Sequence, residues 1–233
     1  MALIYAVEGC DGVGKTHFIQ QHSQVLREEG HKVCLLSTPS KSLPKGTAVR
    51  EVLKNKSLYQ SLSPAQLRQM FVESIQEVAQ QIITLHLQGV YTLFFLDRWW
   101  FSYLAYQFIL EGKSIPQIEE MVNEALVDIF LPLGISTYTI NQFERNLLFP
   151  KVFHFDCPTD PDTLNKFFTK RMQMCQQEGS QDVHDVNNEF QLRVLMNYKH
   201  LFNTLTSPPY GLDYNPLPIP ILEEGVLPNG NTL

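Results

Sequence analysis

The chain has 233 residues, of which 44% are hydrophobic and 18% charged, a balance typical of a folded globular protein. Eighteen basic against twenty-four acidic residues give a net charge of −6, which argues against a surface that coats nucleic acid. The four cysteines are widely spaced, no apolar run is long enough to span a bilayer, and the N-terminus lacks the basic start of a secretory signal. We therefore expect a soluble, cytoplasmic protein with no nucleic-acid partner and no membrane partner.

The first strong pattern is a glycine loop between a predicted strand and a predicted helix. Residues 3–7 are short, apolar and β-prone, and residues 18–26 carry apolar side chains at helical spacing. The loop fits the phosphate-binding pattern of a glycine, four residues and then Gly-Lys-Thr, in which the lysine reaches the β- and γ-phosphates and the threonine hydroxyl binds Mg²⁺. The predicted nucleotide-binding residues are Gly9, Asp11, Gly12, Val13, Gly14, Lys15 and Thr16.

A second buried strand is predicted at 33–36, and a loop rich in Ser, Pro and Lys follows it at 37–46. Ligands of parallel sheets bind at the carboxyl ends of the strands, where this loop begins. Lys41 and Lys45 are therefore candidates for contact with a second phosphate, although two solvated lysines would look the same in the sequence.

A third strand, predicted at 91–96, is apolar throughout and leads into Asp97 and Arg98. A carboxylate at the tip of a strand beside a phosphate loop can hold Mg²⁺, usually through water. A neighbouring arginine can clamp phosphate oxygens with two hydrogen bonds. We favour this interpretation over a structural Asp97–Arg98 ion pair, because the two residues follow a buried strand in a chain with a phosphate loop.

Apolar spacing predicts further helices at 47–54, 64–89, 99–110, 118–130, 160–175 and 190–202, and a fourth strand at 151–156. The apolar stripe of the 64–89 helix includes Phe71 and Ile75, so periodicity alone places both in the core. Residues 133–150 show no convincing helical stripe. The Pro-rich tail at 207–233 has at most an edge strand, at 219–222.

Three stretches resemble the thymidylate kinase family of P-loop nucleoside monophosphate kinases. Residues 8–16 are similar to its phosphate loop, including the acidic residue at Asp11. Residues 96–107 are similar to its strand-three signature, an Asp-Arg-aromatic followed by Ser and then Ala-Tyr-Gln, and residues 190–198 are similar to the helix after its lid. The resemblance runs from Ala2 to about Leu205.

The resemblance implies the α/β class and a three-layer P-loop NTPase fold, with a mostly parallel sheet of about five strands flanked by helices. The kinase domain would cover 1–206, with a lid at about 170–189, and the tail at 207–233 would pack on it or trail from it. The implied enzyme is a phosphotransferase that uses ATP and Mg²⁺ to convert dTMP to dTDP, and members of this family are commonly homodimers. Its catalytic residues would be Lys15, Asp97, Arg98 and Arg171, with Thr16 and Asp97 at the metal.

The resemblance also implies how the acceptor nucleotide binds. Asp11 would face the 3′-hydroxyl of the sugar, and Lys41 and Arg98 would contact the acceptor phosphate. Phe71 would stack on the base, and Tyr106 would pack where a 2′-hydroxyl would sit, favouring a deoxynucleotide. Ser102 and Gln107 would lie near the base. The full implied set is Asp11, Lys41, Phe71, Arg98, Ser102, Tyr106 and Gln107.

The sequence departs from the family pattern at two places. Ile75 replaces an arginine that usually follows the stacking Phe by four residues and reads a thymine oxygen, so dUMP, dCMP, UMP or CMP stays an alternative acceptor. The family places a catalytic arginine in the loop or in the lid. Here the loop has Gly12 and Val13 instead, and Lys170 and Arg171 are the lid candidates.

Three other classes of protein are alternatives to this kinase. A degenerate kinase fold kept as a binding scaffold would explain the lid and Ile75. A nucleoside kinase would need a carboxylate base, for which Glu8 or Asp97 is the candidate. A guanine-specific switch or an ATPase motor is disfavoured, because the chain lacks the base-reading motif of the former and the Asp-Glu of the latter.

Overall fold

The computed structural model describes residues 2–108, 115–156, 160–178 and 188–218. Its centre is a sheet of five strands in the order β2-β3-β1-β4-β5, all parallel. The strands are β1 (Leu3–Glu8), β2 (Val33–Ser37), β3 (Leu93–Asp97), β4 (Lys151–Asp156) and β5 (Tyr214–Pro218). The predicted α/β class and sheet size are confirmed, and the sheet is wholly rather than mostly parallel.

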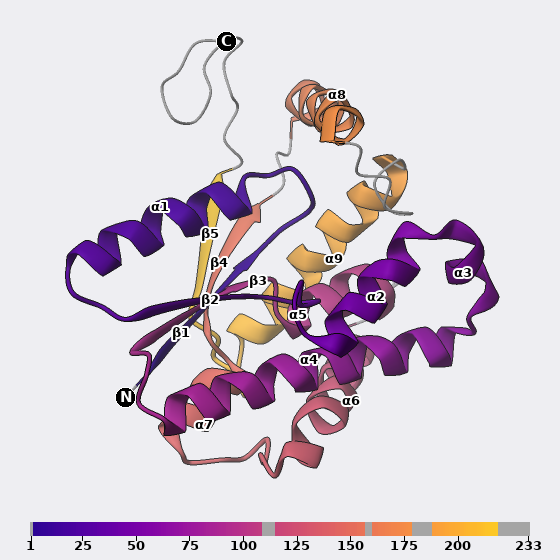
Figure 1. Cartoon of the computed structure of the whole chain (residues 1–233). Coiled ribbons are helices and arrows are strands. Elements are labelled where there is room, and N and C mark those ends of the chain that lie inside the picture. The colour runs from indigo at the N-terminus through magenta and orange to yellow at the C-terminus, as the bar shows by residue number, and fades with distance from the viewer. Residues whose placement is uncertain (1, 109–114, 157–159, 179–187, 219–233) are drawn as a thin grey trace.

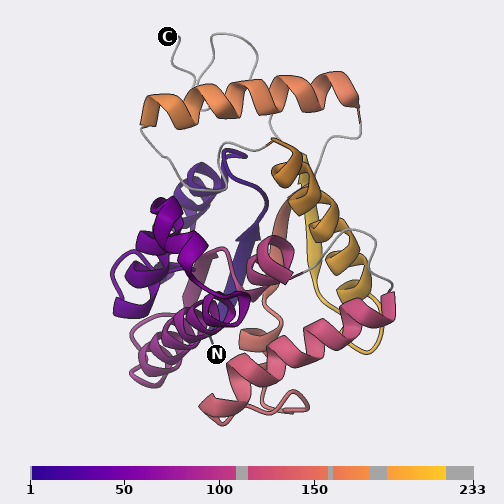
Figure 2. The same ribbon diagram turned by 90° about the vertical axis from the view of Figure 1, so that its right-hand side faces the viewer.

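Helices cover both faces of this sheet. Helix α1 lies on one face, and α2, α4, α5, α6 and α9 lie on the other (Figure 1). Helix α8 lies across one end of the molecule, beyond the carboxyl ends of the strands (Figure 2). The helices are α1 (Lys15–Glu28), α2 (Pro44–Lys54), α3 (Lys56–Ser61), α4 (Pro64–Leu87), α5 (Trp100–Tyr103), α6 (Ile115–Phe130), α7 (Gln142–Leu148), α8 (Pro161–Glu178) and α9 (Asn188–Thr206), with a π-helical turn η1 at Leu104–Phe108 and a 3₁₀ turn η2 at Leu131–Leu133.

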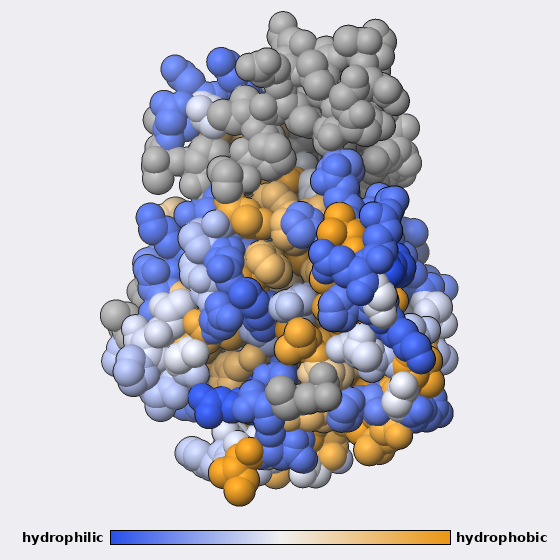
Figure 3. All heavy atoms as spheres, turned by 90° about the vertical axis from the view of Figure 1, so that its left-hand side faces the viewer, coloured by the Kyte–Doolittle hydropathy of each residue, from blue (hydrophilic) through white to orange (hydrophobic). Residues whose placement is uncertain are grey.

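The inner strands are buried on both faces, which is why they are continuous apolar runs. In β3, Phe94 and Leu96 pack into the cluster under α4, α5 and α9, whereas Leu93 and Phe95 pack into the cluster on the α1 side. The outer surface on the α1 side is mostly hydrophilic, with apolar side chains showing in patches between the polar ones (Figure 3). No helix within the described ranges is both long and apolar enough to cross a membrane.

Strand register brings the carboxyl ends of β1, β2 and β3 together. Val7 of β1 and Ser37 of β2 both align with Asp97 of β3, and Glu8 aligns with His154 of β4. The loops that leave these strands therefore start at one edge of the sheet, where parallel α/β proteins bind their ligands.

Several predicted boundaries are wrong. The helix expected from residue 47 begins at Pro44, whose fixed φ suits a first helical turn. The helix expected at 99–110 is instead the short α5 followed by the π-helical turn at Leu104–Phe108. The separate short helix α3 was not predicted.

Residues 133–150 contain a helix that periodicity missed. Asn141 caps α7, its side-chain oxygen accepting hydrogen bonds from the backbone N–H of Phe143 and Glu144. The helix has seven residues and buries only Leu147 and Leu148, too few to make a stripe.

The predicted tail contributes a strand to the sheet. Strand β5 pairs with β4, and its prolines Pro216 and Pro218 fit an edge position because proline has no N–H to donate. The edge strand expected at 219–222 lies outside the described residues. So does the central part of the predicted lid, between α8 and α9.

Candidate active site

The glycine loop leads from β1 into the N-terminus of α1. Gly14 is the N-cap of α1 with φ 93°, and no side chain caps the first turn. Gly9 has φ 135°, and a Cβ there would come within 3.1 Å of Phe155 Cβ, so the loop backbone passes close to β4. The open backbone N–H groups of a helix start form a site for an anion such as a phosphate.

Lys15 lies inside this loop. Its Nζ donates to the carbonyl oxygen of Cys10 at 2.7 Å and lies 4.0 Å from Asp11 Oδ1. The residue is 6% exposed, and burial together with the nearby Arg98 charge lowers the pKa of its ammonium group. A desolvated cation at the centre of an anion cradle interacts strongly with phosphate oxygens.

Thr16 and Asp97 meet across the sheet edge. Thr16 Oγ1 donates to Asp97 Oδ2 at 3.5 Å, although 81 residues separate the two in the chain. A threonine hydroxyl beside a carboxylate next to a phosphate cradle fits Mg²⁺, which keeps several waters and takes few protein ligands. Among the described residues no group of three or more His, Cys, Asp or Glu side chains forms a metal site.

Arg98 occupies a left-handed backbone conformation, with φ 71°, at the turn after β3. Such a conformation is uncommon for a residue other than glycine and often marks a functional site. The backbone N–H of Arg98 donates to the Val7 carbonyl at 3.1 Å, which ties this turn to β1.

The guanidinium of Arg98 is bonded to the phosphate loop itself. Nη1 donates to the carbonyl oxygen of Gly9 at 2.7 Å, and Nη2 is paired with Asp11 Oδ1. Nη2 also donates to the Tyr106 hydroxyl at 3.1 Å, and the guanidinium carbon lies 4.9 Å from the centre of the Tyr106 ring. Tyr106 in turn donates to Asp11 Oδ2 at 3.1 Å. The structure therefore brings together Asp11, Arg98 and Tyr106, three of the residues that the resemblance assigns to the acceptor nucleotide.

Comparison with known proteins agrees with this geometry. The model of the thymidylate kinase family matches residues 7–132, which include the loop, Asp97, Arg98 and Tyr106. The chain belongs to the thymidylate kinase family.

Three curated relatives extend the match. A probable thymidylate kinase of Archaeoglobus fulgidus is 34% identical over 122 residues, 52% of this chain and 58% of that protein. A thymidylate kinase of Thermosipho africanus is 26% identical over 191 residues, covering 81% and 82%. A thymidylate kinase of Mesoplasma florum is 28% identical over 130 residues, covering 56% and 60%. The match thus spans less than two thirds of the first and third relatives.

The residues that the family pattern assigns to the base lie on α4 and α5. Phe71 is 7% exposed, and its ring centre is 6.3 Å from that of Tyr103. Ile75 is completely buried in the main core. At the position where the family pattern has an arginine, this chain thus has a core residue whose side chain offers no hydrogen bond.

The two lysines of the loop after β2 differ. Lys41 is exposed. Lys45 Nζ is paired with Glu73 Oε2 of α4 at 2.5 Å, so its charge is already neutralised and it is a poorer candidate for a phosphate contact. The same helix supplies Glu77, which accepts from the backbone N–H of Lys45 at 3.0 Å and Gly46 at 3.3 Å.

Two predicted site residues have side chains outside the described part of the structure. Gln107 lies in the π-helical turn and Arg171 in α8, but both side chains fall outside the described part of the structure, and their roles stay predictions. Val13 places its side chain in the α1-side core, so only its backbone can contact a nucleotide.

Sequence reasoning missed two contributors. Ser102 Oγ, expected near the base, contacts Arg98, the Glu8 carboxylate and the Tyr198 hydroxyl. Tyr198 lies on the apolar stripe of the helix predicted at 190–202, which favours a core position, and the sequence suggests Glu8 only as a candidate base. The only available signal was an acidic residue ending a buried strand.

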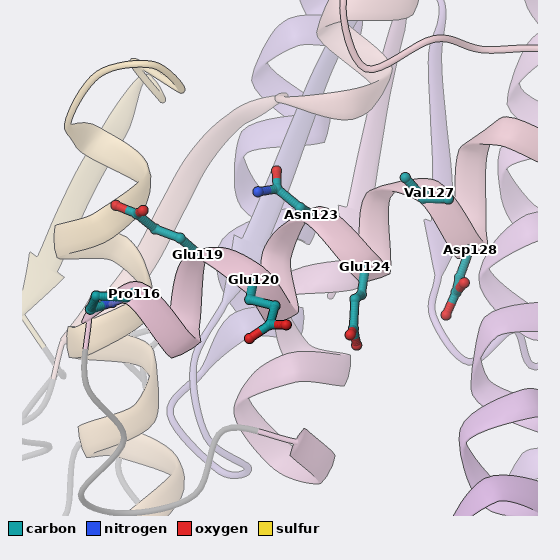
Figure 4. Close-up of a pocket in the computed structure, with 7 residues that line it drawn as sticks. All are labelled: Pro116, Glu119, Glu120, Asn123, Glu124, Val127 and Asp128. Atoms are coloured by element: carbon teal, nitrogen blue, oxygen red, sulfur yellow. The ribbon is translucent and has the colours of Figure 1, made fainter.

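A hollow of about 600 Å³ also lies along α6 (Figure 4). Its lining includes the carboxylates of Glu119, Glu120, Glu124 and Asp128. These negative charges disfavour a phosphate there, and the hollow shares no residue with the loop site.

Proposed function

We propose that this protein transfers the γ-phosphoryl group of ATP to dTMP, giving dTDP and ADP, with Mg²⁺ as the metal. The observation that carries the proposal is the bonding of Arg98, the residue expected at the acceptor phosphate, to Gly9 and Asp11 of the phosphate loop. This bonding supports the proposal, because an acceptor phosphate bound by Arg98 would lie beside the site proposed for the donor phosphates. Kinases need this arrangement, because their catalysis is mainly positioning and charge neutralisation.

Each residue then has a definite task. The loop N–H groups and Lys15 hold the donor phosphates, and Arg98 holds the acceptor phosphate in line with them. An oxygen of the acceptor phosphate forms the new P–O bond as the bond from the γ-phosphorus to the β,γ-bridging oxygen breaks. Mg²⁺, held by Thr16 and through water by Asp97, would neutralise charge on the donor phosphates.

No strong general base is needed, because the nucleophile is already an ionised phosphate. The buried position of Glu8, which is 0% exposed, argues against its use as the base of a nucleoside kinase. We also propose that α8 with the segment to α9 acts as the lid, since α8 lies beyond the carboxyl ends of the strands (Figure 2). Arg171 of α8 is the proposed lid cation, and closure would exclude water that would otherwise hydrolyse ATP.

The test is the release of ADP from ATP and Mg²⁺ with dTMP as acceptor, for the wild type and for Lys15→Met. We expect dTMP-dependent turnover in the wild type and a loss of about a hundredfold or more in the variant, the usual scale for removing one preorganised charge contact. A folded wild type that binds ATP and turns over no acceptor would contradict the proposal. It would favour the alternative that the protein is a degenerate kinase fold kept as a binding scaffold. The homodimer implied by the resemblance is proposed with it and is tested by light scattering.

A further inference from the structure

Glu8 ends β1 with a fully buried carboxylate. Oε1 accepts from the backbone N–H of Trp99 at 2.5 Å, and Oε2 accepts from Ser102 Oγ at 2.5 Å and from the Tyr198 hydroxyl at 2.9 Å. Burying a carboxylate is costly, and an apolar side chain in its place is often as stable or more so. The presence of a carboxylate here therefore points to a role other than filling the core.

Each partner of Glu8 also holds Arg98. Arg98 Nη1 donates to Ser102 Oγ and to the Tyr198 hydroxyl, both at 3.3 Å. Trp99 directly follows Arg98, so its bond to Glu8 fixes the backbone on the far side of the left-handed residue. Glu8 thus constrains both the guanidinium and the backbone of Arg98 through Ser102, Tyr198 and Trp99.

The charge of an ionised Glu8 strengthens the hold on Arg98, because a carboxylate attracts the guanidinium. An ionised carboxylate only accepts, and the two hydroxyls, 2.6 Å apart, have one proton each. Both protons are taken up by Glu8 or by the neighbouring hydroxyl, which leaves oxygen lone pairs facing Arg98. The protonated acid still satisfies the hydrogen bonds, since its proton completes a ring through the two hydroxyls, but it lacks the charge. An amide lacks the charge as well and brings two N–H protons, one more than these contacts can take up.

We propose that Glu8 is a positioning residue whose ionised carboxylate holds Arg98 in place for the acceptor phosphate, and that Tyr198 extends this hold to α9. The inference rests on the proposed function, because it deepens the role of Arg98 in that reaction. Helix α9 is tied to the same region a second time, since Asn197 Nδ2 donates to the Ala105 carbonyl at 2.8 Å. The helix that follows the proposed lid is therefore bonded to the residues around the acceptor phosphate.

The described neighbours His154 and Tyr198 both titrate well away from neutral pH, unlike Glu8. Burial raises the pKa of Glu8 to about 7, against the opposing effect of its hydrogen bonds and the Arg98 charge. His154, its neighbour on β4, has a pKa lowered to about 3 by burial, and burial raises the pKa of Tyr198. Arg98 stays charged throughout.

The experiment compares the wild type with Glu8→Gln and Tyr198→Phe, and uses Tyr214→Phe as the matched control. Tyr214 is another phenol of the same aromatic cluster, and its hydroxyl contacts His154 Nδ1 rather than Arg98. Two readouts are taken: the ¹⁵N signals and hydrogen exchange of the Arg98 guanidinium, and the kcat/KM for dTMP beside the KM for ATP between pH 6 and pH 8.

We expect Glu8→Gln and Tyr198→Phe to speed guanidinium exchange and to lower kcat/KM for dTMP about tenfold at pH 8, the size of one hydrogen bond to a charged group. The KM for ATP should stay within about twofold of the wild type, on the scale of an untouched contact. The ratio of wild-type to Glu8→Gln kcat/KM should fall toward one as the pH drops below about 7, because the wild type then loses its own carboxylate charge. Titration of dTMP cancels in this ratio.

The outcomes separate the two proposals. A wild type with no turnover contradicts the kinase assignment, while the guanidinium signals still test the hold on Arg98. Guanidinium exchange in both variants equal to that of Tyr214→Phe would overturn the positioning role, as would an equal loss in kcat/KM for dTMP and in affinity for ATP. Tyr198→Phe retains the acid, so it decides the question if Glu8→Gln does not fold.

Discussion

At the scale of single residues, Arg98 is where three parts of the chain meet. Its guanidinium is bonded to Gly9 and Asp11 of the loop, to Tyr106 of the π-helical turn and to Tyr198 of α9. The planar fork of arginine makes these bonds in several directions at once, which the single ammonium group of lysine cannot do.

Replacement of this fork gives the first prediction. Arg98→Lys keeps the charge, but we expect it to lose at least about tenfold in kcat/KM for dTMP, since a bidentate contact becomes a point charge. Arg98→Ala should lose about a hundredfold or more. Steady-state kinetics at saturating ATP measure both. Wild-type values for Arg98→Lys would show that only charge matters at this position.

The second prediction concerns stability and pH. The pKa of Glu8 is about 7 in the folded protein and 4.5 without burial, so between these values the folded protein keeps a proton that the unfolded chain has lost. The contribution of Glu8 to the free energy of unfolding therefore falls as the pH rises through this window. The fall is about 3 kcal/mol in total, at about 1.4 kcal/mol per pH unit. Glu8→Gln does not titrate.

Urea denaturation of both proteins from pH 5 to pH 8 measures this effect. The difference in free energy of unfolding, Glu8→Gln minus wild type, should increase as the pH rises to about 7 and stay constant above that pH. Parallel curves across the range would contradict the burial cost assigned to Glu8.

The sequence was informative about single residues where the chemistry is carried by a local motif. Lys15 and Thr16 were predicted because the loop pattern fixes their neighbours, and Asp97 because parallel strand ends share one edge. Glu8 and Tyr198 could not be paired in this way. They lie 190 residues apart, and Tyr198 occupies a position of an apolar stripe that a core residue would fill equally well.

At the scale of elements, α2 and the loop before it pack without spare room. A Cβ at Gly46 would lie 2.4 Å from the backbone nitrogen of Ser40, in the loop that also carries Lys41. The Arg50 side chain braces the same loop from α2 through two hydrogen bonds to the Pro39 carbonyl, at 2.7 and 3.0 Å.

The third prediction follows from this packing. Gly46→Ala should destabilise the protein by about 3 kcal/mol, because the clash is with backbone rather than with a flexible side chain. Gly89→Ala is the control, because a Cβ at Gly89 would meet nothing within 4 Å. The φ of 66° at Gly89 leaves only the cost of a left-handed backbone conformation, about 1–2 kcal/mol. Thermal or urea denaturation gives both values. An equal cost at the two sites would show that the Ser40 backbone gives way.

The elements that sequence reasoning found are those with a long stripe or a run buried on both faces. Strand β4 was predicted with its observed bounds, 151–156. Helix α7 was not predicted, because it buries only two side chains and is further held by hydrogen bonds to its backbone: the indole N–H of Trp99 donates to the Leu147 carbonyl and that of Trp100 to the Leu148 carbonyl. Hydrogen bonds of this kind leave no period in the sequence.

At the scale of the whole molecule, the sheet edge at the ends of β1, β2 and β3 gathers the loop, the proposed metal residues Thr16 and Asp97, and Arg98, with α8 beyond it (Figure 2). A ligand that binds only the folded state stabilises the protein by mass action.

The fourth prediction uses this linkage. ATP with Mg²⁺ at about a hundred times its dissociation constant should raise the free energy of unfolding of the wild type by about 2.7 kcal/mol. Lys15→Met should gain much less at the same concentration, since the variant lacks the ammonium group inside the loop. The midpoint of thermal unfolding with and without the nucleotide measures this. An equal gain in both proteins would place the nucleotide elsewhere.

The identity of the nucleotide that the protein phosphorylates tests the proposed site as a whole. The Ile75 side chain offers no hydrogen bond to a base, so we expect discrimination among the pyrimidines to come from the shape of the site. The sugar contact proposed for Tyr106 would separate deoxynucleotides from ribonucleotides. The most direct measurement is a competition in which equal concentrations of dTMP, dUMP, dCMP, UMP and CMP share one reaction with ATP and Mg²⁺. The ratio of diphosphates formed early equals the ratio of kcat/KM values. We predict that dTDP is the main product and that it disappears with Lys15→Met; a different main diphosphate, or none from folded protein, would contradict the assignment as a dTMP kinase.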